Sequence, residues 1–123
     1  MTYFKPDTKK GKRLVASQAE WSAIRREKLT GRCPVSGCMV SDTDLHHIIP
    51  RSLGGGDHRW NLIGLCHGHH MCYEDRELLW LDVADAVRSS LTDEQVSEIV
   101  AAKSIVFLDR YYPSKNNTRR GNV

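Results

Sequence analysis

The spacing of apolar and polar residues changes along the chain, and each change predicts a different element. In "SQAEWSAIRREKLTG", residues 17–31, the apolar positions could form one face of a helix, with Ser17 and Glu20 as a capping box and a glycine beyond the end. "TDLHHII" (43–49) and "NLIGLC" (61–66) are short and rich in branched residues, which is typical of strands. The segment between them contains three consecutive glycines and is expected to form a loop.

The pattern becomes helical from His67 onward. The apolar positions of this pattern are Leu78, Leu79, Leu81, Val83 and Val87. Residues 91–113 predict a further helix that opens with a second capping box, Thr92 and Gln95, and that Pro113 ends. The last part of this segment could instead be a strand. The central order is therefore strand, long loop, strand, helix, which favours an α+β fold.

The length of 123 residues suits one small domain. We expect a flexible basic arm at 1–16, a single domain at 17–113 and a basic tail at 114–123. The first 32 residues carry nine Lys and Arg against three acidic residues, whereas the rest of the chain carries nine against twelve. Basic ends suit the phosphates of nucleic acids, but they are also typical of solvated, disordered tails.

The compartment affects how the four cysteines are interpreted. The N-terminal residues are polar and basic, without the pattern of a secretory signal, and no apolar run is long enough for a membrane helix. We therefore expect a cytoplasmic protein with no membrane partner. In that setting cysteines bind metal more often than they form disulfides. A core with only two Phe also suggests that a metal contributes to stability.

Two short knuckles offer ligands for zinc. Cys33 and Cys38 are spaced C-x4-C within "CPVSGC", and Cys66 and His69 are spaced C-x2-H about thirty residues later. Three thiolates and one imidazole make a valid tetrahedral zinc site. The sequence therefore predicts one structural Zn²⁺ held by these four residues.

The histidines are concentrated in one part of the chain, because all six lie between His46 and His70. His46 and His47 are adjacent on a predicted strand, where neighbouring side chains point to opposite faces. They are therefore poor twin ligands of one ion, and one could hold a metal while the other does something else. The plain alternative is that one is buried and the other lies on the surface.

The stretch "DLHHIIPRSLGGGDHRWNLIGLCHGHH", residues 44–70, resembles the HNH endonuclease family, the zinc-containing branch of the ββα-metal nucleases. The resemblance rests on a double histidine, H-x-x-P, a glycine-rich loop, N-L and L-C-x-x-H-H in that order, and it covers residues 33 to about 74. It implies a ββα-metal core at about 33–78, a zinc knuckle and flanking helices, with a helical part at about 78–113. By analogy, the size and composition suit a phage or mobile-element protein in a bacterial host cytoplasm.

The resemblance implies a function, which is hydrolysis of DNA phosphodiester bonds. In this family the second histidine of the pair is the general base, here His47, and the asparagine opening the second strand pins the loop and orients the base, here Asn61. Arg51 and Arg59 flank the loop and could contact phosphate, although exposed loop arginines are as often merely solvated.

The resemblance also implies a second, catalytic metal, which could be Mg²⁺, Mn²⁺, Ni²⁺ or Zn²⁺. Its ligands would be His46 and His70. Glu74 stands one helical turn further on, where some members have a histidine, and could be a third ligand or an ordinary exposed residue. Asp44 stands where some members carry an acidic group that supports a ligand. No small-molecule cofactor is expected.

Two potential metal ligands in "CHGHHMC", His67 and Cys72, remain without an assigned role. His67 is expected to face solvent or phosphate. Cys72 is expected to be a small buried residue, although the use of His69 in place of the commoner cysteine raises the question of whether Cys72 competes for zinc. The alternative to a nuclease is a zinc-stapled nucleic-acid-binding module without cleavage activity, which would need only the four zinc ligands.

Overall fold

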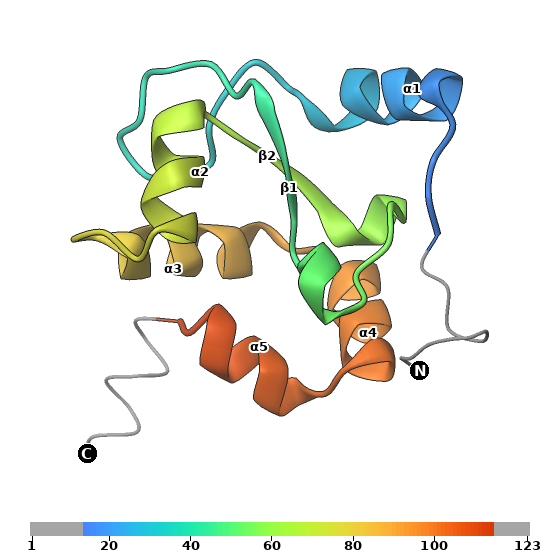
Figure 1. Ribbon diagram of the computed structural model, residues 1–123. Helices are drawn as coiled ribbons and strands as arrows, with labels where there is room; N and C mark the ends of the chain where they lie inside the picture. Colours follow the sequence, from blue (N-terminus) through green and yellow to red (C-terminus); the bar gives the residue numbers. More distant parts are fainter. Residues whose placement is uncertain (1–13, 115–123) are drawn as a thin grey trace.

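The computed structural model describes residues 14–114 and has a small α+β fold with a two-stranded sheet (Figure 1). The expectations for residues 1–13 and 115–123, which form most of the predicted arm and tail, lie outside the described residues. The elements in chain order are α1 (Gln18–Lys28), β1 (Asp44–His47), the 3-10 turns η1 (Arg51–Leu53) and η2 (Arg59–Asn61), β2 (Leu62–Leu65), α2 (His67–Glu74), α3 (Trp80–Ser90), α4 (Asp93–Ala102) and α5 (Ile105–Tyr111).

The two strands form an antiparallel pair in which His46 lies opposite Ile63 and His47 opposite Leu62. They are shorter than the segments that predicted them, at four residues each. The predicted order of strand, loop, strand and helix is confirmed. It places α2 immediately after β2, next to the start of β1, so residues from the helix and the first strand can meet.

Both predicted capping boxes are present. Ser17 and Glu20 exchange hydrogen bonds at the start of α1, and Thr92 and Gln95 do the same at the start of α4. Each box satisfies amide groups that the first turn of a helix leaves without a partner. The helices α1 and α4 therefore begin directly after Ser17 and Thr92, as the sequence predicts.

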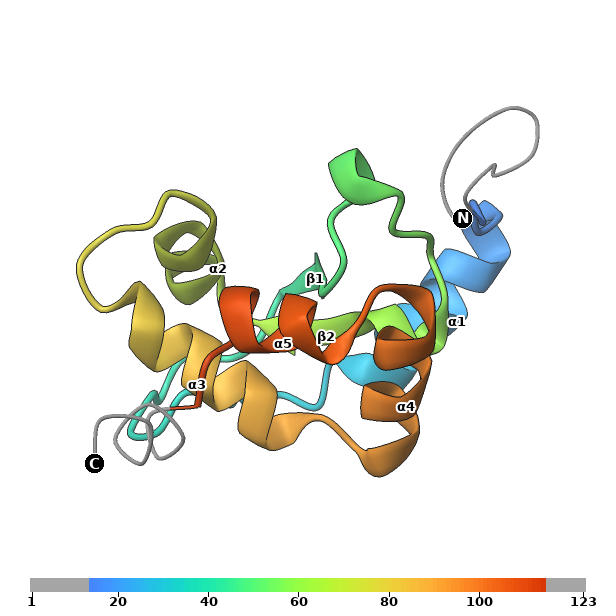
Figure 2. The same ribbon diagram turned by 90° about the horizontal axis from the view of Figure 1, so that it is seen from below.

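Apolar side chains lie on both sides of the hairpin. On one side Ile24 of α1 packs with Leu45 and Leu62. The larger cluster lies on the other side, where α3, α4 and α5 gather, as Figure 2 shows. Its fully buried members include Ile48, Leu65, Val83, Val87, Ile99, Leu108 and Tyr112. Cys33 and Cys66 belong to the same cluster, so two of the four predicted zinc ligands lie in the core.

The chain is helical after His67, as the pattern predicts, but α2 and α3 are two separate helices. The chain turns between α2 and α3, where Arg76 and Leu79 have positive φ angles of 53° and 80°. Leu78 and Leu79 lie in or beside this turn and are 88% and 63% exposed, and Leu81 is also exposed. The turn rotates α3 so that Val83 and Val87 face the core in their place.

The segment 91–113 forms two helices, so the alternative of a terminal strand is wrong. The break falls at Lys103 and Ser104, where the hydroxyl oxygen of Ser104 accepts a hydrogen bond from the amide of Phe107 at 3.1 Å. A serine cap of this kind begins a new helix. The second helix, α5, brings Phe107 and Leu108 into the core.

Candidate metal centres and active site

Cys33, Cys38, Cys66 and His69 come together as the sequence predicts. Their ligand atoms all lie within 4.8 Å of one another. Cys33 and Cys38 flank a turn, and Cys66 caps the first turn of α2, which carries His69. The four residues are therefore positioned to bind a metal ion such as zinc.

The distances within this cluster match a tetrahedral zinc site. His69 Nδ1 lies 3.5 Å from Cys33 Sγ and 3.3 Å from Cys66 Sγ, and Cys38 Sγ lies 4.0 Å from Cys66 Sγ. With Zn–S of about 2.3 Å and Zn–N of about 2.0 Å, tetrahedral ligands have S···S and S···N separations of roughly 3.8 and 3.5 Å. Burial raises the pKa of Cys33 to about 11, so its thiolate is favoured only beside a cation.

Cys72 does not belong to this cluster. Its Sγ is 3.5 Å from the carbonyl oxygen of Leu78, and the side chain is half-buried rather than buried as predicted. Cys72 therefore does not compete with His69 in this arrangement.

A second cluster is formed by His46 of β1 with His70 and Glu74 of α2, whose ligand atoms also lie within 4.8 Å of one another. His46 is 1% exposed, whereas Glu74 reaches solvent. His70 and Glu74 are four positions apart in α2, so both project from the same side of the helix. The group could hold a metal ion with two nitrogens and one carboxylate oxygen.

His46 Nδ1 is a buried nitrogen that makes no hydrogen bond. Glu74 Oε2 lies 3.1 Å away, but the geometry is not that of a hydrogen bond. Burial lowers the pKa of His46, although Glu74 opposes this effect, so the neutral ring is favoured. A cation between the buried His46 Nδ1 and the solvent-reaching Glu74 carboxylate would give this nitrogen the partner that it lacks.

His46 Nε2 has a different partner, the hydroxyl of Tyr112, at 2.7 Å. This hydroxyl in turn donates a hydrogen bond to the carbonyl oxygen of Ile48 at 2.8 Å. Burial raises the pKa of Tyr112 well above its usual value, so the phenol keeps its proton. No spacing in the sequence indicates this contact, because Tyr112 lies 66 positions after His46.

Asp44 supports the same cluster from β1. Its Oδ2 lies 2.9 Å from His70 Nδ1 and 2.8 Å from His67 Nδ1. Burial opposes ionisation of Asp44, but the hydrogen bonds to the two histidines lower its pKa to about 2. His67 is 72% exposed, which agrees with its predicted position facing solvent.

His47 points away from His46 and contacts a carboxylate of its own. Its Nε2 lies 2.7 Å from Asp57 Oδ1, and its ring stacks on Trp21 of α1 with 6.1 Å between ring centroids. Asp57 is buried, and its Oδ2 accepts a hydrogen bond from the amide of Ala16. Burial raises the pKa of Asp57, but the hydrogen bonds from His47 and Ala16 outweigh this and lower it.

Sequence reasoning missed Asp57 and Trp21 as neighbours of His47. The only signal for Asp57 was its place directly after the glycine run, in the loop that follows the histidine pair. Residues 14–16, which were assigned to the arm, contact this loop as well: the amide of Asp57 donates to the carbonyl of Leu14 at 2.9 Å.

Asn61 is fully buried and holds the two ends of the loop together. Its Oδ1 accepts from the amide of Ile49 at 2.7 Å, and its Nδ2 donates to the carbonyl oxygens of Ile49 and Gly56. Gly55 must be glycine here, since an added Cβ would fall 1.7 Å from the Ile49 carbonyl oxygen. Asn61 thus fixes the loop that carries Asp57.

The two loop arginines lie in different places. Arg51 is exposed beside the cleft that contains His47, with its guanidinium 3.8 Å from Asp57. Arg59 pairs with Glu27 of α1 at 2.8 Å.

A cleft of about 500 Å³ joins these features. It is lined by Trp21, Leu45, His47, Pro50, Arg51, His70, Met71, Glu74 and Asp75. His47 and two members of the second cluster, His70 and Glu74, therefore line one cleft, whereas the buried His46 does not line it.

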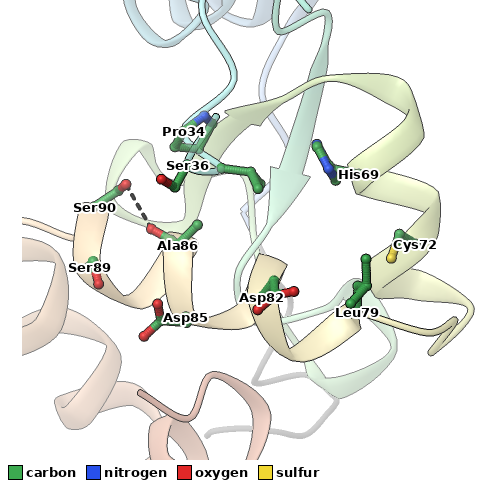
Figure 3. Close-up of a pocket in the computed structure, with 11 residues that line it drawn as sticks. Pro34, Ser36, His69, Cys72, Leu79, Asp82, Asp85, Ala86, Ser89 and Ser90 are labelled. Atoms are coloured by element: carbon green, nitrogen blue, oxygen red, sulfur yellow. Dashed lines mark hydrogen bonds between the residues drawn. The ribbon is translucent and has the colours of Figure 1, made fainter. Parts of the chain in front are cut away.

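A second cleft, of about 660 Å³, shares no lining residue with the first. It lies between the Pro34–Ser36 turn, α2 and α3 (Figure 3). His69 and Cys72 line it from α2, and Asp82 and Asp85 line it from α3.

No protein-family model, curated protein or solved structure gives a significant match to this chain. Among the described residues, 14–114, no helix has the length and apolar character needed to cross a membrane. The function is therefore inferred from the geometry of the site.

Proposed function

We propose that this protein is a metal-dependent endonuclease of the HNH type, which hydrolyses phosphodiester bonds in DNA. One observation carries the proposal: His47 lines the same cleft as His70 and Glu74, and the ligand atom of the buried His46 lies within 4.8 Å of those of that pair. A potential base and a potential metal site thus face one space. The proposal is tested by asking whether the protein, with a divalent ion, converts supercoiled plasmid to open-circular or linear DNA.

The residues present fit a catalytic metal. His46 Nδ1 is buried without a hydrogen bond and lies near the Glu74 carboxylate, an arrangement that a cation would complete. His46, His70 and Glu74 would hold the ion, and Asp44 would orient His70 through its Nδ1. When bound, a divalent ion supplies a Lewis acid that neutralises charge on the phosphate and on the leaving oxygen.

His47 would serve as the general base. Asp57 is ionised and accepts a hydrogen bond from Nε2, so the lone pair of the neutral ring is at Nδ1. In the proposed reaction His47 removes a proton from water as the water oxygen attacks phosphorus and the 3′ oxygen leaves. Asp57 stabilises the imidazolium that forms, while Trp21 stacked on the ring limits its movement.

The ββα-metal core is also part of this proposal. The paired strands β1 and β2 followed directly by α2 support it, with one structural Zn²⁺ bound by the Cys33, Cys38, Cys66 and His69 cluster. DNA as the partner is supported by the excess of Lys and Arg in the first 32 residues. Arg51 at the rim of the cleft is a candidate phosphate contact.

The second candidate is a zinc-stapled nucleic-acid-binding module without catalysis. It accounts for the Cys3His cluster and the basic ends. It does not account for the buried His46 Nδ1 beside Glu74, or for the pairing of His47, which lines the cleft, with the buried carboxylate of Asp57. These two arrangements favour the nuclease.

Replacing Glu74 with alanine is expected to raise the Mg²⁺ or Mn²⁺ concentration needed for half-maximal cleavage at least several-fold, because the site loses the carboxylate of its His46, His70 and Glu74 ligand set. The zinc content should not change. Glu77→Ala is the matched control, since Glu77 is an exposed carboxylate three positions further on. A metal titration of Glu74→Ala that overlays the wild-type curve would remove Glu74 from the ligand set.

Replacing Asp57 with asparagine is expected to slow cleavage by about 10²–10⁴-fold, the range for loss of an effective general base. The amide has the size of the carboxylate but lacks its charge, so it neither fixes the tautomer of His47 nor stabilises the imidazolium. Single-turnover rates at saturating metal measure the effect, with Asp93→Asn at the start of α4 as the control. A rate within twofold of wild type would show that Asp57 does not assist the base.

A further inference from the structure

We propose that Tyr112 is a positioning residue for the second metal site: its hydroxyl holds His46 in the tautomer whose lone pair points toward His70 and Glu74. This inference rests on the proposed function, because it assigns a role at the metal site of that function. Tyr112 follows α5 and lies well outside the HNH-like segment, residues 33 to about 74.

The hydrogen-bond geometry determines which nitrogen of His46 carries the proton. A phenol has one proton to donate. Tyr112 donates it to the carbonyl oxygen of Ile48 at 2.8 Å, and a carbonyl oxygen can only accept. The same hydroxyl lies 2.7 Å from His46 Nε2, so this contact requires Nε2–H as the donor. In the neutral ring the lone pair is then at Nδ1.

That lone pair is at the atom that the metal site needs. His46 Nδ1 is the buried nitrogen without a hydrogen bond, and it lies 3.1 Å from Glu74 Oε2. The opposite tautomer would put a proton on Nδ1 and close the site to a metal. Tyr112 therefore does for His46 what Asp44 does for His70, whose Nδ1 contacts the Asp44 carboxylate.

Packing keeps the hydroxyl in place. Tyr112 is fully buried and its ring stacks on that of Tyr73, with centroids 5.0 Å apart, while the His46 ring meets the Tyr73 ring edge-on. The Ile48 carbonyl belongs to a residue only two positions after His46. The end of the C-terminal helical part is thereby tied to the strand that carries the metal ligand.

The test compares Tyr112→Phe with wild type in two measurements on the full-length, zinc-loaded protein. Long-range ¹H–¹⁵N NMR of the histidine rings, without added divalent ion, reports the tautomer of His46. Calorimetric titration with Mn²⁺ reports affinity at the second site. We expect Nε2–H for His46 in wild type, a mixture of tautomers in Tyr112→Phe, and Mn²⁺ affinity reduced by about 10–100-fold in the variant with zinc retained.

Tyr111→Phe is the matched control, because it removes a hydroxyl from the neighbouring tyrosine, whose ring packs on Phe107. It should leave the His46 tautomer and the Mn²⁺ affinity unchanged. An unchanged tautomer and affinity in Tyr112→Phe would overturn the inference while leaving the nuclease proposal intact.

The wild-type NMR measurement decides the matter even where Tyr112→Phe fails to fold. Nδ1–H on His46 of the wild-type protein would overturn the inference directly. A wild-type protein that shows Nε2–H and binds Mn²⁺, but cuts no DNA, would contradict the nuclease and leave the role of Tyr112 standing.

Discussion

A chain in which serine replaces Cys66 is expected to lose its zinc and to unfold. Cys66 is buried in the main core cluster and also caps α2, so its loss disturbs the metal site and the helix together. Structural zinc contributes apparent binding energies of about 10–16 kcal/mol, which is as large as the whole stability of a typical domain, about 5–15 kcal/mol. Zinc content by mass spectrometry and near-UV circular dichroism measure the two losses.

Cys72→Ser is the matched control for this experiment. It changes a cysteine of the same helix that lies outside the cluster, so the variant should keep one zinc per chain and a native spectrum. A Cys66→Ser chain that remains folded without zinc, or a wild-type chain that remains folded in strong chelator, would contradict the structural role of the metal.

Replacing His47 with alanine is expected to reduce DNA cleavage by about 10²–10⁴-fold while folding, zinc content and DNA binding persist. The side chain lies at the cleft between Trp21 and Asp57, so its removal takes away the proposed base without disturbing either metal cluster. Single-turnover cleavage and a DNA-binding titration on the same preparations separate the chemical step from binding.

His58→Ala is the control for the loss of an imidazole. His58 lies in the loop between β1 and β2, next to Asp57, but its ring stacks on Trp60 and it does not line the cleft. This variant should cut DNA at a rate close to wild type. Full cleavage by His47→Ala would remove His47 from the role of base.

The cluster of three cysteines and His69 could be predicted because its ligands form two pairs, and the members of each pair are close together in the sequence. Two knuckles with short spacing, C-x4-C and C-x2-H, each bring two ligands together, so only one long-range contact was left to infer. The divergence of His46 and His47 followed in the same way from the alternation of side chains along a strand. The buried His46 and the cleft-facing His47 bear out that reasoning.

The turn between α2 and α3 could not be predicted in this way. Its positive φ angles fall at Arg76 and Leu79, whereas a sequence signals such angles through glycine or asparagine. Leu78, Leu79 and Leu81 continued an apolar pattern that suited a single helix. Tertiary packing of α3 determined which apolar residues were buried, and the pattern alone could not show that choice.

The partners of His46 and His47 could not be predicted from the sequence for a different reason. Asp57 is brought to His47 by a loop that Asn61 fixes from inside, and Tyr112 reaches His46 from the end of the chain's last described helix. Neither pair has a characteristic spacing. Such contacts depend on the fold as a whole, and only the three-dimensional arrangement reveals them.

The most direct test of the central claim is conversion of supercoiled plasmid by the purified, zinc-loaded protein. Mg²⁺ or Mn²⁺ is added in one series and omitted in the other, with His47→Ala run beside wild type in both. The proposed function predicts open-circular or linear DNA only for wild type with added ion. Wild-type protein that binds the plasmid but leaves it supercoiled with every divalent ion tried, including Ni²⁺ and Zn²⁺, would contradict the nuclease and favour the non-catalytic zinc module.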